Sequence, residues 1–586
     1  MSDPFMTAAK WGAVLLTLAL ALPALQLGRV GDDFAQLLAV EGADSPFRGV
    51  FSRLDLFRWV SGRPSENGVL RDRGALPWWA TDDVRIAFWR PASSVLHHLD
   101  AALFGRGTVG PHLHSVLWLC ALVASAALVF RRVLAAGAAA IALLLFVVDD
   151  GHALATIWIA NRNALVAGTL STLGLLLHLR WRESGDRWAA PASAACFAGA
   201  LLAGEAALGG VAYLFAYELL SAKGSASSRL RAAAPVVCIT AGWLAVYKWL
   251  GYGAASSTMY VDPFAQPSEW LANAVLRVPV LLGALTVGLP ADAWTVSAQA
   301  RGILAVAGLL GTGAVAMVVR SAWPTLDSDM RRHVKWLAAG AALAVLPVTS
   351  IFPSSRLLVL PSLGSAAVLA IVLQHLWRER GLNAKRFALS SFGALLVLFH
   401  GVLAPASWLG FTFLLKAGEA RADRIQTALH EELDPATVPL QRVVTLWSDP
   451  FGFMTTGAQW RLRTGVDPRA WWVLSTAPGD QVFTRTGPGT LELELAQGRL
   501  LQSDTETGFR PPTRALGLGD RITLGTGLSV DIIAADAQGI QRVRFNFDAP
   551  LEDPSLVLLE WREGVLRRLT PPAIGTRWTL TPPPLL

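Results

Sequence analysis

Long apolar runs separated by short polar segments make up the chain as far as about Pro405. A bilayer's hydrocarbon core is about 30 Å thick, and about 20 helical residues cross it. Runs approaching that length predict about 11 spans, at 11–27, 113–130, 133–148, 154–178, 189–203, 206–221, 233–250, 302–319, 336–352, 357–375 and 388–405. The pattern therefore indicates a mainly α, polytopic membrane helical bundle.

The segment 269–290 has a helical pattern, but Arg277, Pro279 and Pro290 interrupt it. Counting it as a span would put a strongly basic loop on the outer side of the membrane. We therefore interpret it as an amphipathic or re-entrant helix at the outer surface.

Basic residues gather in alternate short loops of the expected bundle. The loops in question hold Arg131 and Arg132; Arg180, Arg182 and Arg187; Lys223, Arg229 and Arg231; Arg320, Arg331, Arg332 and Lys335; and Arg378, Arg380, Lys385 and Arg386. The positive-inside rule places such loops, and the N-terminus with them, in the cytoplasm. An odd number of spans then puts the C-terminus outside the cytoplasmic (inner) membrane.

Two regions do not follow the pattern of spans. The loop 28–110 is long, mixes charged and aromatic residues, and is expected to be functional, with helical stretches on the membrane surface. After Pro405 a charged helical segment, 416–433, is followed by alternating apolar positions and Gly/Pro turns, at 442–447, 490–495, 521–524, 528–533, 541–547, 556–561 and 576–580. We thus expect a transmembrane domain, 1–409, and an extracytoplasmic β-rich domain, 410–586.

Composition agrees with a membrane protein: 53% of residues are hydrophobic and 16% charged. The net charge of +7 is explained by the cytoplasmic loops, so no nucleic-acid partner is implied. The three cysteines lie in apolar runs without metal-ligand spacing. His97-His98 and His112-x-His114 could ligate zinc, but adjacent histidines on a helix diverge and no cysteine accompanies them. No metal site is predicted and no cofactor is established, although a divalent cation is not excluded.

Asp32 and Asp33 stand where the first apolar run ends, at the expected water boundary. The simplest explanation is a hydrated helix end, and it weighs equally with function for the pair alone. The order of the motifs that follow the pair favours function. Arg85 to Pro91 reads Arg-Ile-Ala-Phe-Trp-Arg-Pro, Phe104-Gly105 follows, and His112 opens the next span.

This order resembles the GT-C glycosyltransferases, in the branch of protein O-mannosyltransferases and tetratricopeptide-linked transmembrane mannosyltransferases. The resemblance covers residues 11–405, and each motif is short, so its specificity lies in order and topology. Further matches are His152 and Arg162, preceded by the acids Asp149 and Asp150; Gly204-Glu205 against a family Lys-Glu; and Ser354-Ser355-Arg356 through Pro361-Ser362-Leu363-Gly364, the most specific match.

The resemblance implies transfer of a monosaccharide, with mannose the family's sugar, from a polyprenyl-phosphate donor to a hydroxyl of a protein or glycan acceptor. Asp33 or Asp32 would be the base that takes the hydroxyl proton. Arg356 and Arg162, helped by His152, would hold the departing phosphate, because a guanidinium matches phosphate geometry. Arg356 could equally be an anchor at the membrane edge. Inversion at the sugar carbon needs one carboxylate base.

Two departures support an alternative. The family's Glu, which lines the donor site, falls on Leu154, and its Lys falls on Gly204. Asp149, Asp150 and Glu205 would be cavity acids, and Asp149 or Asp150 could substitute for the missing Glu. Otherwise the chain is a catalytically silent GT-C-like scaffold or lipid-binding membrane protein, and a transporter is a weaker third reading. Acids and arginines lining one outward cavity would favour transfer.

Overall fold

The computed structural model describes residues 4–42, 54–380 and 383–583. The chain divides into two compact units. Unit 1 comprises 1–28, 89–250 and 263–415, and unit 2 comprises 29–88, 251–262 and 416–586. Most of the expected outer loop therefore belongs with the C-terminal residues, although sequence alone assigned it to the transmembrane domain.

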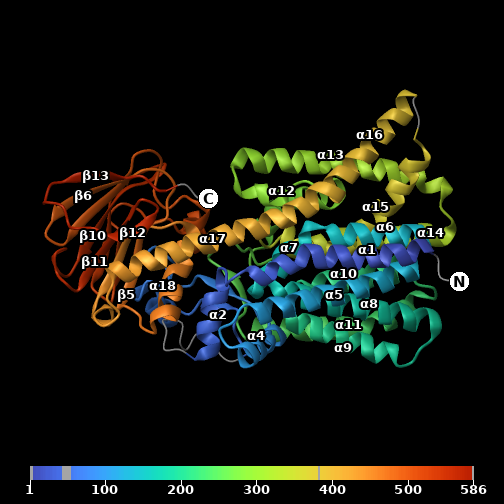
Figure 1. Ribbon diagram of the computed structural model, residues 1–586, viewed down its shortest axis with the longest axis horizontal. Coiled ribbons are helices and arrows are strands. Elements are labelled where there is room, and N and C mark those ends of the chain that lie inside the picture. The colour runs from blue at the N-terminus through green and yellow to red at the C-terminus, as the bar shows by residue number, and fades with distance from the viewer. Residues whose placement is uncertain (1–3, 43–53, 381–382, 584–586) are drawn as a thin grey trace. The chain divides into compact units, whose positions relative to one another are not determined.

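Unit 1 is built of helices (Figure 1). They are α1 (Pro4–Ala21), α4 (Pro91–Phe104), α5 (Val109–Val133), α6 (Ala136–Val148), α7 (Ala153–Ile157), α8 (Asn163–Ser184), α9 (Ala189–Ala203), α10 (Ala207–Leu220), α11 (Ala226–Trp249), α12 (Pro267–Val287), α13 (Ala298–Ala322), α14 (Ser328–Val348), α15 (Pro361–Arg378), α16 (Ala384–Leu398) and the first part of α17 (Ala404–Glu432).

Seven helices of the described residues are long and apolar enough to cross a membrane, or eight if one bent pair forms a single span. They are Ala9–Gln26, Val109–Val133, Ile159–Ser184, Ala226–Trp249, Pro267–Val287, Ala298–Thr325 and Arg386–Glu432, with Ala136–Val148 and Asp150–Ile157 as the bent pair. The chain is thus a multi-pass membrane protein. The count of about 11 is not shown: α9 and α10 are shorter apolar helices, and α14 and α15 are not among the seven, whereas α12, which was not expected to span, is.

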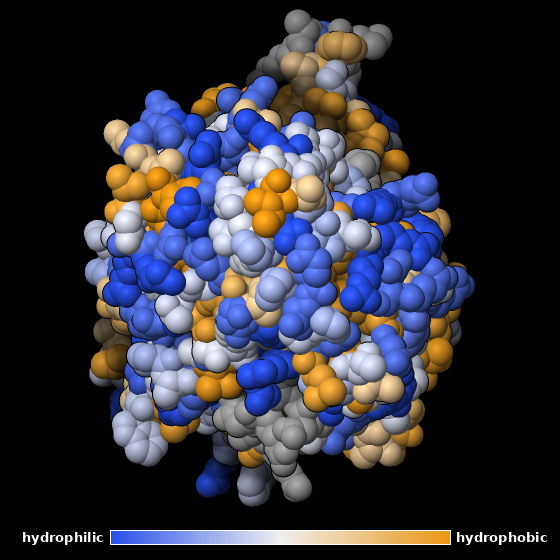
Figure 2. All heavy atoms as spheres, turned by 90° about the vertical axis from the view of Figure 1, so that its left-hand side faces the viewer, coloured by the Kyte–Doolittle hydropathy of each residue, from blue (hydrophilic) through white to orange (hydrophobic). Residues whose placement is uncertain are grey.

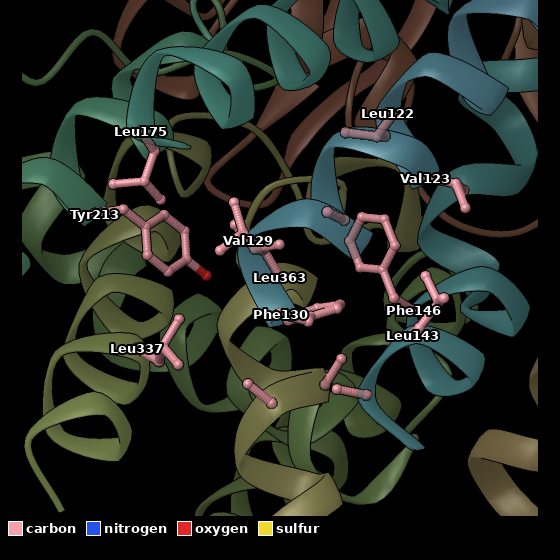
Figure 3. Close-up of a cluster of buried hydrophobic side chains, with 14 of the residues drawn as sticks. Leu122, Val123, Val129, Phe130, Leu143, Phe146, Leu175, Tyr213, Leu337 and Leu363 are labelled. Carbon is pink, nitrogen blue, oxygen red and sulfur yellow. The ribbon is translucent and has the colours of Figure 1, made fainter. Parts of the chain in front are cut away.

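The interior of unit 1 is a continuous apolar core. Figure 3 shows part of it, with Phe130 of α5 and Phe146 of α6 near Leu363 of α15. By contrast, α13 keeps Leu309 and Leu310 65% and 68% exposed. Large apolar side chains exposed along a spanning helix are expected to contact lipid.

Helices α12 and α13 lie side by side (Figure 1). A Cβ on Gly283 would lie 2.5 Å from Gly308 Cα, and one on Gly311 would lie 2.5 Å from Val287 Cγ2, so later residues of one helix meet later residues of the other. The segment 288–297 must therefore return along α12 before α13 begins. Because α12 is long and apolar enough to span, the interpretation of 269–290 as an amphipathic or re-entrant helix at the outer surface stays a prediction.

Unit 2 contains three sheets. Their strands are β1 (Arg58–Ser61), β2 (Arg85–Ala87) and β3 (Gly253–Ala255) in the first; β13 (Arg577–Leu580), β6 (Gln481–Gly487), β7 (Thr490–Leu495), β10 (Gly539–Phe547), β9 (Leu528–Asp536) and β8 (Arg521–Leu524) in the second; and β12 (Val565–Arg568), β11 (Leu556–Arg562), β4 (Arg442–Trp447) and β5 (Ala470–Ser475) in the third. The predicted β-rich C-terminal region is thus confirmed.

The third sheet has parallel pairing of β4 with β5 and with β11, and α18 (Pro450–Thr464) connects β4 to β5.

Residues from the predicted loop complete the core of unit 2. The Trp78 indole donates to the Leu474 carbonyl at 2.9 Å, and Trp79 is fully buried. The surface in Figure 2, on the side where the strands lie, is largely hydrophilic, as expected for a part of the protein in water.

Candidate functional site

The irregular backbone between α6 and α8 organises the polar residues of unit 1. Here the chain forms η2 (Asp150–His152), α7 and η3 (Ile159–Arg162), and the direction changes by 46° after α6. Non-helical backbone at membrane depth is tolerated only where protein buries it or where it lines a water-filled cavity. This break is therefore the place in unit 1 where polar chemistry is most expected.

Asp149 and Asp150 lie at the start of the break, beside the segment that carries Arg356. Asp149 Oδ1 accepts from the Gly151 amide at 2.8 Å, and η2 packs against η6 (Ser355–Leu358). A Cβ on Gly151 would lie 3.2 Å from the Ser355 carbonyl oxygen, so a larger residue would strain this contact. The structure thus brings together the two acids and the Ser-Ser-Arg motif.

Asp292, which the sequence analysis did not single out, joins the same cluster from the returning segment after α12. Its carboxylate accepts from Ser354 Oγ at 2.6 Å, from Ser355 Oγ at 2.7 Å and from the Ser355 amide at 3.1 Å. A carboxylate so placed orders the backbone immediately before Arg356. A lone acid 62 residues from its serines leaves no sequence signal.

Arg356 is half-buried, with its guanidinium carbon 5.5 Å from the centroid of the Trp158 ring. Among the described residues it forms no ion pair with a carboxylate. Stacking on an aromatic face stabilises a guanidinium without occupying its N–H donors. Its donors can therefore serve an anion.

Arg162 is placed differently. It is 1% exposed and forms an ion pair with Asp100 of α4, and it also donates to the Pro111 carbonyl at 3.3 Å. His114 Nδ1 lies 2.7 Å from the other Asp100 oxygen. Trp118 donates to His114 Nε2 at 3.0 Å, so Nδ1 carries the proton and donates to Asp100. These contacts favour a structural role for Arg162.

Two ionisable groups near Arg162, Asp100 and His97, have shifted pKa values. Both lie on α4, outside the candidate spans. Burial tends to raise the pKa of the Asp100 carboxyl, but the His114 hydrogen bond and the Arg162 charge outweigh it and hold the pKa below its ordinary value. Burial, reinforced by the Arg162 charge, lowers the pKa of His97 to about 3. His97 is therefore a neutral imidazole near neutral pH.

Glu205 is held by Arg90, whose Nε lies 2.8 Å from Glu205 Oε2. The preceding Gly204 is confined, because a Cβ there would lie 3.2 Å from Asn163 Oδ1. A side chain at this position would require the Asn163 amide to shift by a few tenths of an ångström. A glycine at position 204, where the family that the sequence resembles has a lysine, therefore suits the local packing.

His152 and Leu154 lie in apolar surroundings. The His152 ring is fully buried, 4.5 Å from the Phe146 centroid and 6.3 Å from that of Trp408. Leu154 packs against a small apolar cluster that includes Leu27. These surroundings favour a core role for His152, and a glutamate in place of Leu154 would bring a carboxylate into that cluster.

Asp32 and Asp33 occupy the first turn of α2 (Asp32–Glu41), in unit 2. Gly31 precedes the helix with φ of 52°, which favours glycine, and the Val30 amide donates to Asp33 Oδ2 at 2.9 Å. Asp33 is 4% exposed. Acids in the first turn are favourable for any helix, so their position facing the arginines of unit 1 stays a prediction.

Unit 2 also contains a surface pocket. It lies along α18 and the edge of β5, and its lining includes Arg73, Phe453, Gly457, Arg461, Asp467 and Trp471. The Trp471 indole is fixed by donating to Thr445 Oγ1 at 3.0 Å. A concave site with an aromatic base and a few polar groups is typical of small-ligand binding. Among the described residues no group of three or more His, Cys, Asp or Glu is placed to hold a metal.

No protein-family model and no curated protein matches the chain. Among solved structures it is similar to ArnT from Cupriavidus metallidurans bound to undecaprenyl phosphate, with 14% identity, a TM-score of 0.42, and coverage of 82% of this chain and 93% of that chain. It is also similar to the oligosaccharyltransferase AglB from Archaeoglobus fulgidus in complex with an inhibitory peptide and a dolichol-phosphate, with 12% identity and a TM-score of 0.41. That match covers 79% of this chain but 64% of AglB.

These are similarities to GT-C membrane glycosyltransferases at low sequence identity. TM-scores of this size carry no inference about activity. The function proposed below therefore depends on the residues of this chain.

Proposed function

We propose that the chain is a membrane-embedded, inverting glycosyltransferase of the GT-C type that uses a polyprenyl-phosphate monosaccharide on the extracytoplasmic side. The observation that carries the proposal is Arg356, a guanidinium stacked on Trp158 and without a carboxylate partner among the described residues. A lipid phosphate at the membrane surface would complete its hydrogen bonds. Mannose remains the sugar that the sequence resemblance implies.

In the proposed reaction, the acceptor hydroxyl oxygen attacks the anomeric carbon from the face opposite the phosphate. The bond between that carbon and the phosphate oxygen breaks, and the electron pair leaves with the polyprenyl phosphate. The hydroxyl proton passes to Asp33 or Asp32 as general base. Arg356 stabilises the charge that develops on the leaving phosphate.

Two variants test this assignment in membranes supplied with a polyprenyl-phosphate sugar. Arg356→Gln should reduce sugar transfer by about 100-fold or more, the usual cost of one donor to developing charge. The control is Arg380→Gln, because Arg380 also stacks on a tryptophan, Trp377, at the end of α15. The double change Asp32→Asn and Asp33→Asn should abolish transfer. Unchanged transfer in that variant would rule out the acids as base.

A second function, a catalytically silent lipid-binding protein or scaffold, is favoured by specific contacts. Arg162 and Glu205 are occupied by Asp100 and Arg90, and His152 is packed between aromatic rings. Binding of polyprenyl phosphate without transfer to any acceptor would identify this function. In that case Arg356→Gln should still weaken lipid binding, and the change at Asp32 and Asp33 should have no effect on it.

We also propose that the unit 2 pocket binds a carbohydrate part of the acceptor. Its support is the combination of an aromatic base, Trp471, with two guanidinium groups, Arg73 and Arg461, and small residues along α18. Gly457 lies beside the Trp471 ring, since a Cβ there would lie at an ordinary contact distance of 3.9 Å from its Cε3. Aromatic faces supply contact area, and the polar groups orient hydroxyls.

A further inference from the structure

The segment between α14 and α15, residues 349–360, carries Arg356 and is anchored at its beginning and just before Arg356. Both anchors come from α12 and from the segment 288–297 that follows it. Arg277 of α12 holds the beginning of the segment, and Asp292 holds the residues just before Arg356.

The first anchor is a buried arginine. Arg277 is 5% exposed, and its Nη1 donates to the carbonyl of Thr349 at 2.7 Å. Thr349 caps the C-terminus of α14, where unsatisfied carbonyls carry partial negative charge. A cation at this place is stabilised by the helix end, and in turn it fixes where the segment starts.

The second anchor is Asp292, which accepts three hydrogen bonds from Ser354 and Ser355. Bonds to an ionised carboxylate are shorter and stronger than neutral ones. Because one bond comes from the Ser355 amide, Asp292 fixes the backbone as well as the serine side chains. The next residue is Arg356, so little freedom is left in the direction from which its side chain leaves.

We propose that Arg277 and Asp292 are positioning residues that hold Arg356 over Trp158, ready to receive a lipid phosphate. The proposal rests on the phosphate-binding role of Arg356 given above. Neither residue needs to touch the lipid. A guanidinium that must find its place after the phosphate arrives binds more weakly than one already held there.

Binding of undecaprenyl phosphate to the purified full-length protein in nanodiscs tests the proposal, with hydrogen exchange of peptides covering 349–357 measured on the same samples. Asp292→Asn and Arg277→Met should each weaken lipid binding by about tenfold, the size of effect seen when one hydrogen-bonded network is broken. Both variants should speed exchange in 349–357. Arg277→Lys, which can still donate to Thr349, should recover part of the binding.

Matched controls come from the opposite end of α14. Arg331 also donates to a backbone carbonyl, that of Trp323 at 3.1 Å, and Asp327 also accepts from an amide, that of Met330 at 2.8 Å. Arg331→Gln and Asp327→Asn should leave both lipid binding and exchange in 349–357 unchanged. A second variant, Ser354→Ala with Ser355→Ala, removes the same bonds from the other side and should match Asp292→Asn.

The outcomes separate the two proposals. Unchanged exchange and binding in Asp292→Asn and in the double serine variant would overturn the positioning role while leaving that of Arg356 intact. Faster exchange in Asp292→Asn, together with normal lipid binding by Arg356→Gln, would instead show that the phosphate-binding role of Arg356 is wrong. The positioning role also requires that adding Asp292→Asn to Arg356→Gln cause no further loss of lipid binding, because Asp292 acts through Arg356.

Discussion

Arg162, at the end of η3, and Asp100 of α4 form an ion pair in which both side chains are almost completely buried. His114 and the Pro111 carbonyl complete the hydrogen bonds of the pair. A buried charge whose partner is removed is strongly destabilising, whereas a solvent-exposed pair contributes little. This relationship decides how variants at Arg162 are to be interpreted.

Asp100→Asn should lower the free energy of unfolding by about 3–5 kcal/mol, because it leaves the Arg162 guanidinium buried and uncompensated. The control is Glu183→Gln, which removes the partner of Arg132 in a partly exposed pair and should cost less than about 1 kcal/mol. Thermal unfolding of the detergent-solubilised protein measures both. Equal melting temperatures for Asp100→Asn and wild type would show that Arg162 is compensated elsewhere.

Stability should also fall on mild acidification because of His97. Its folded pKa of about 3 lies below the unfolded value of about 6.5, so the unfolded chain binds the proton first. The contribution of neutral His97 to the free energy of unfolding is complete above a pH of about 6.5 and decreases as the pH falls toward 3. Between pH 7.5 and 5.0 the loss is about 2 kcal/mol.

The charged and titratable groups near His97 are Arg162, Asp100, His98 and His114. His97→Gln removes the titrating group and should reduce the drop in melting temperature between these pH values. An identical drop in the variant and the wild type would assign the acid sensitivity to another residue.

The apolar pattern predicted the class of the protein because lipid-facing and buried helices both need long apolar runs. The same pattern could not separate α9 and α10, shorter than a typical span, from full spans. In the C-terminal region, the alternation at 490–495 and 521–524 coincides with β7 and β8, since each strand has one buried face.

Residues 29–88 lie in unit 2, whereas the sequence analysis placed them with the transmembrane domain, and their strands explain the difference. Strands β1 to β3 have three or four residues each, and β2 pairs with β3 across more than 160 residues of sequence, as in Ile86 with Ala254. Short strands with distant partners leave no periodic signal. For the site, Arg356 could be found from its motif, but Asp292 and Asp100 are recognisable only from their contacts.

Gly74→Ala tests whether residues 29–88 belong to the folded core of unit 2. Gly74 has φ of +81°, and a Cβ there would lie 1.9 Å from the Trp471 carbonyl oxygen. Gly465 is the matched control, with φ of +79° and no atom within 4 Å of the added Cβ. Both variants bear the strain of a left-handed residue, about 1–2 kcal/mol.

Only Gly74→Ala adds the clash with β5, so it should be less stable than Gly465→Ala by about 2 kcal/mol. Limited proteolysis of the full chain, read at cleavage sites in 416–583, measures the difference. Similar protection of the two variants would mean that 71–75 does not pack on β5 in solution.

Carbohydrate binding by the unit 2 pocket should be lost when the pocket is filled. Gly457→Leu places a branched side chain beside the Trp471 ring, within the lining of the pocket. The control is Ala496→Leu, an exposed position after β7 that does not line the pocket. Binding of the full-length protein to a printed array of oligosaccharides measures the effect.

We expect the wild type and Ala496→Leu to bind the same glycans and Gly457→Leu to bind none of them. The expected loss is at least tenfold in affinity, because displaced ring contacts are worth about 1–3 kcal/mol. Trp471→Phe removes the bond to Thr445 but keeps an aromatic base, so it should weaken binding without abolishing it. Equal binding by Gly457→Leu and Ala496→Leu would place carbohydrate recognition outside this pocket.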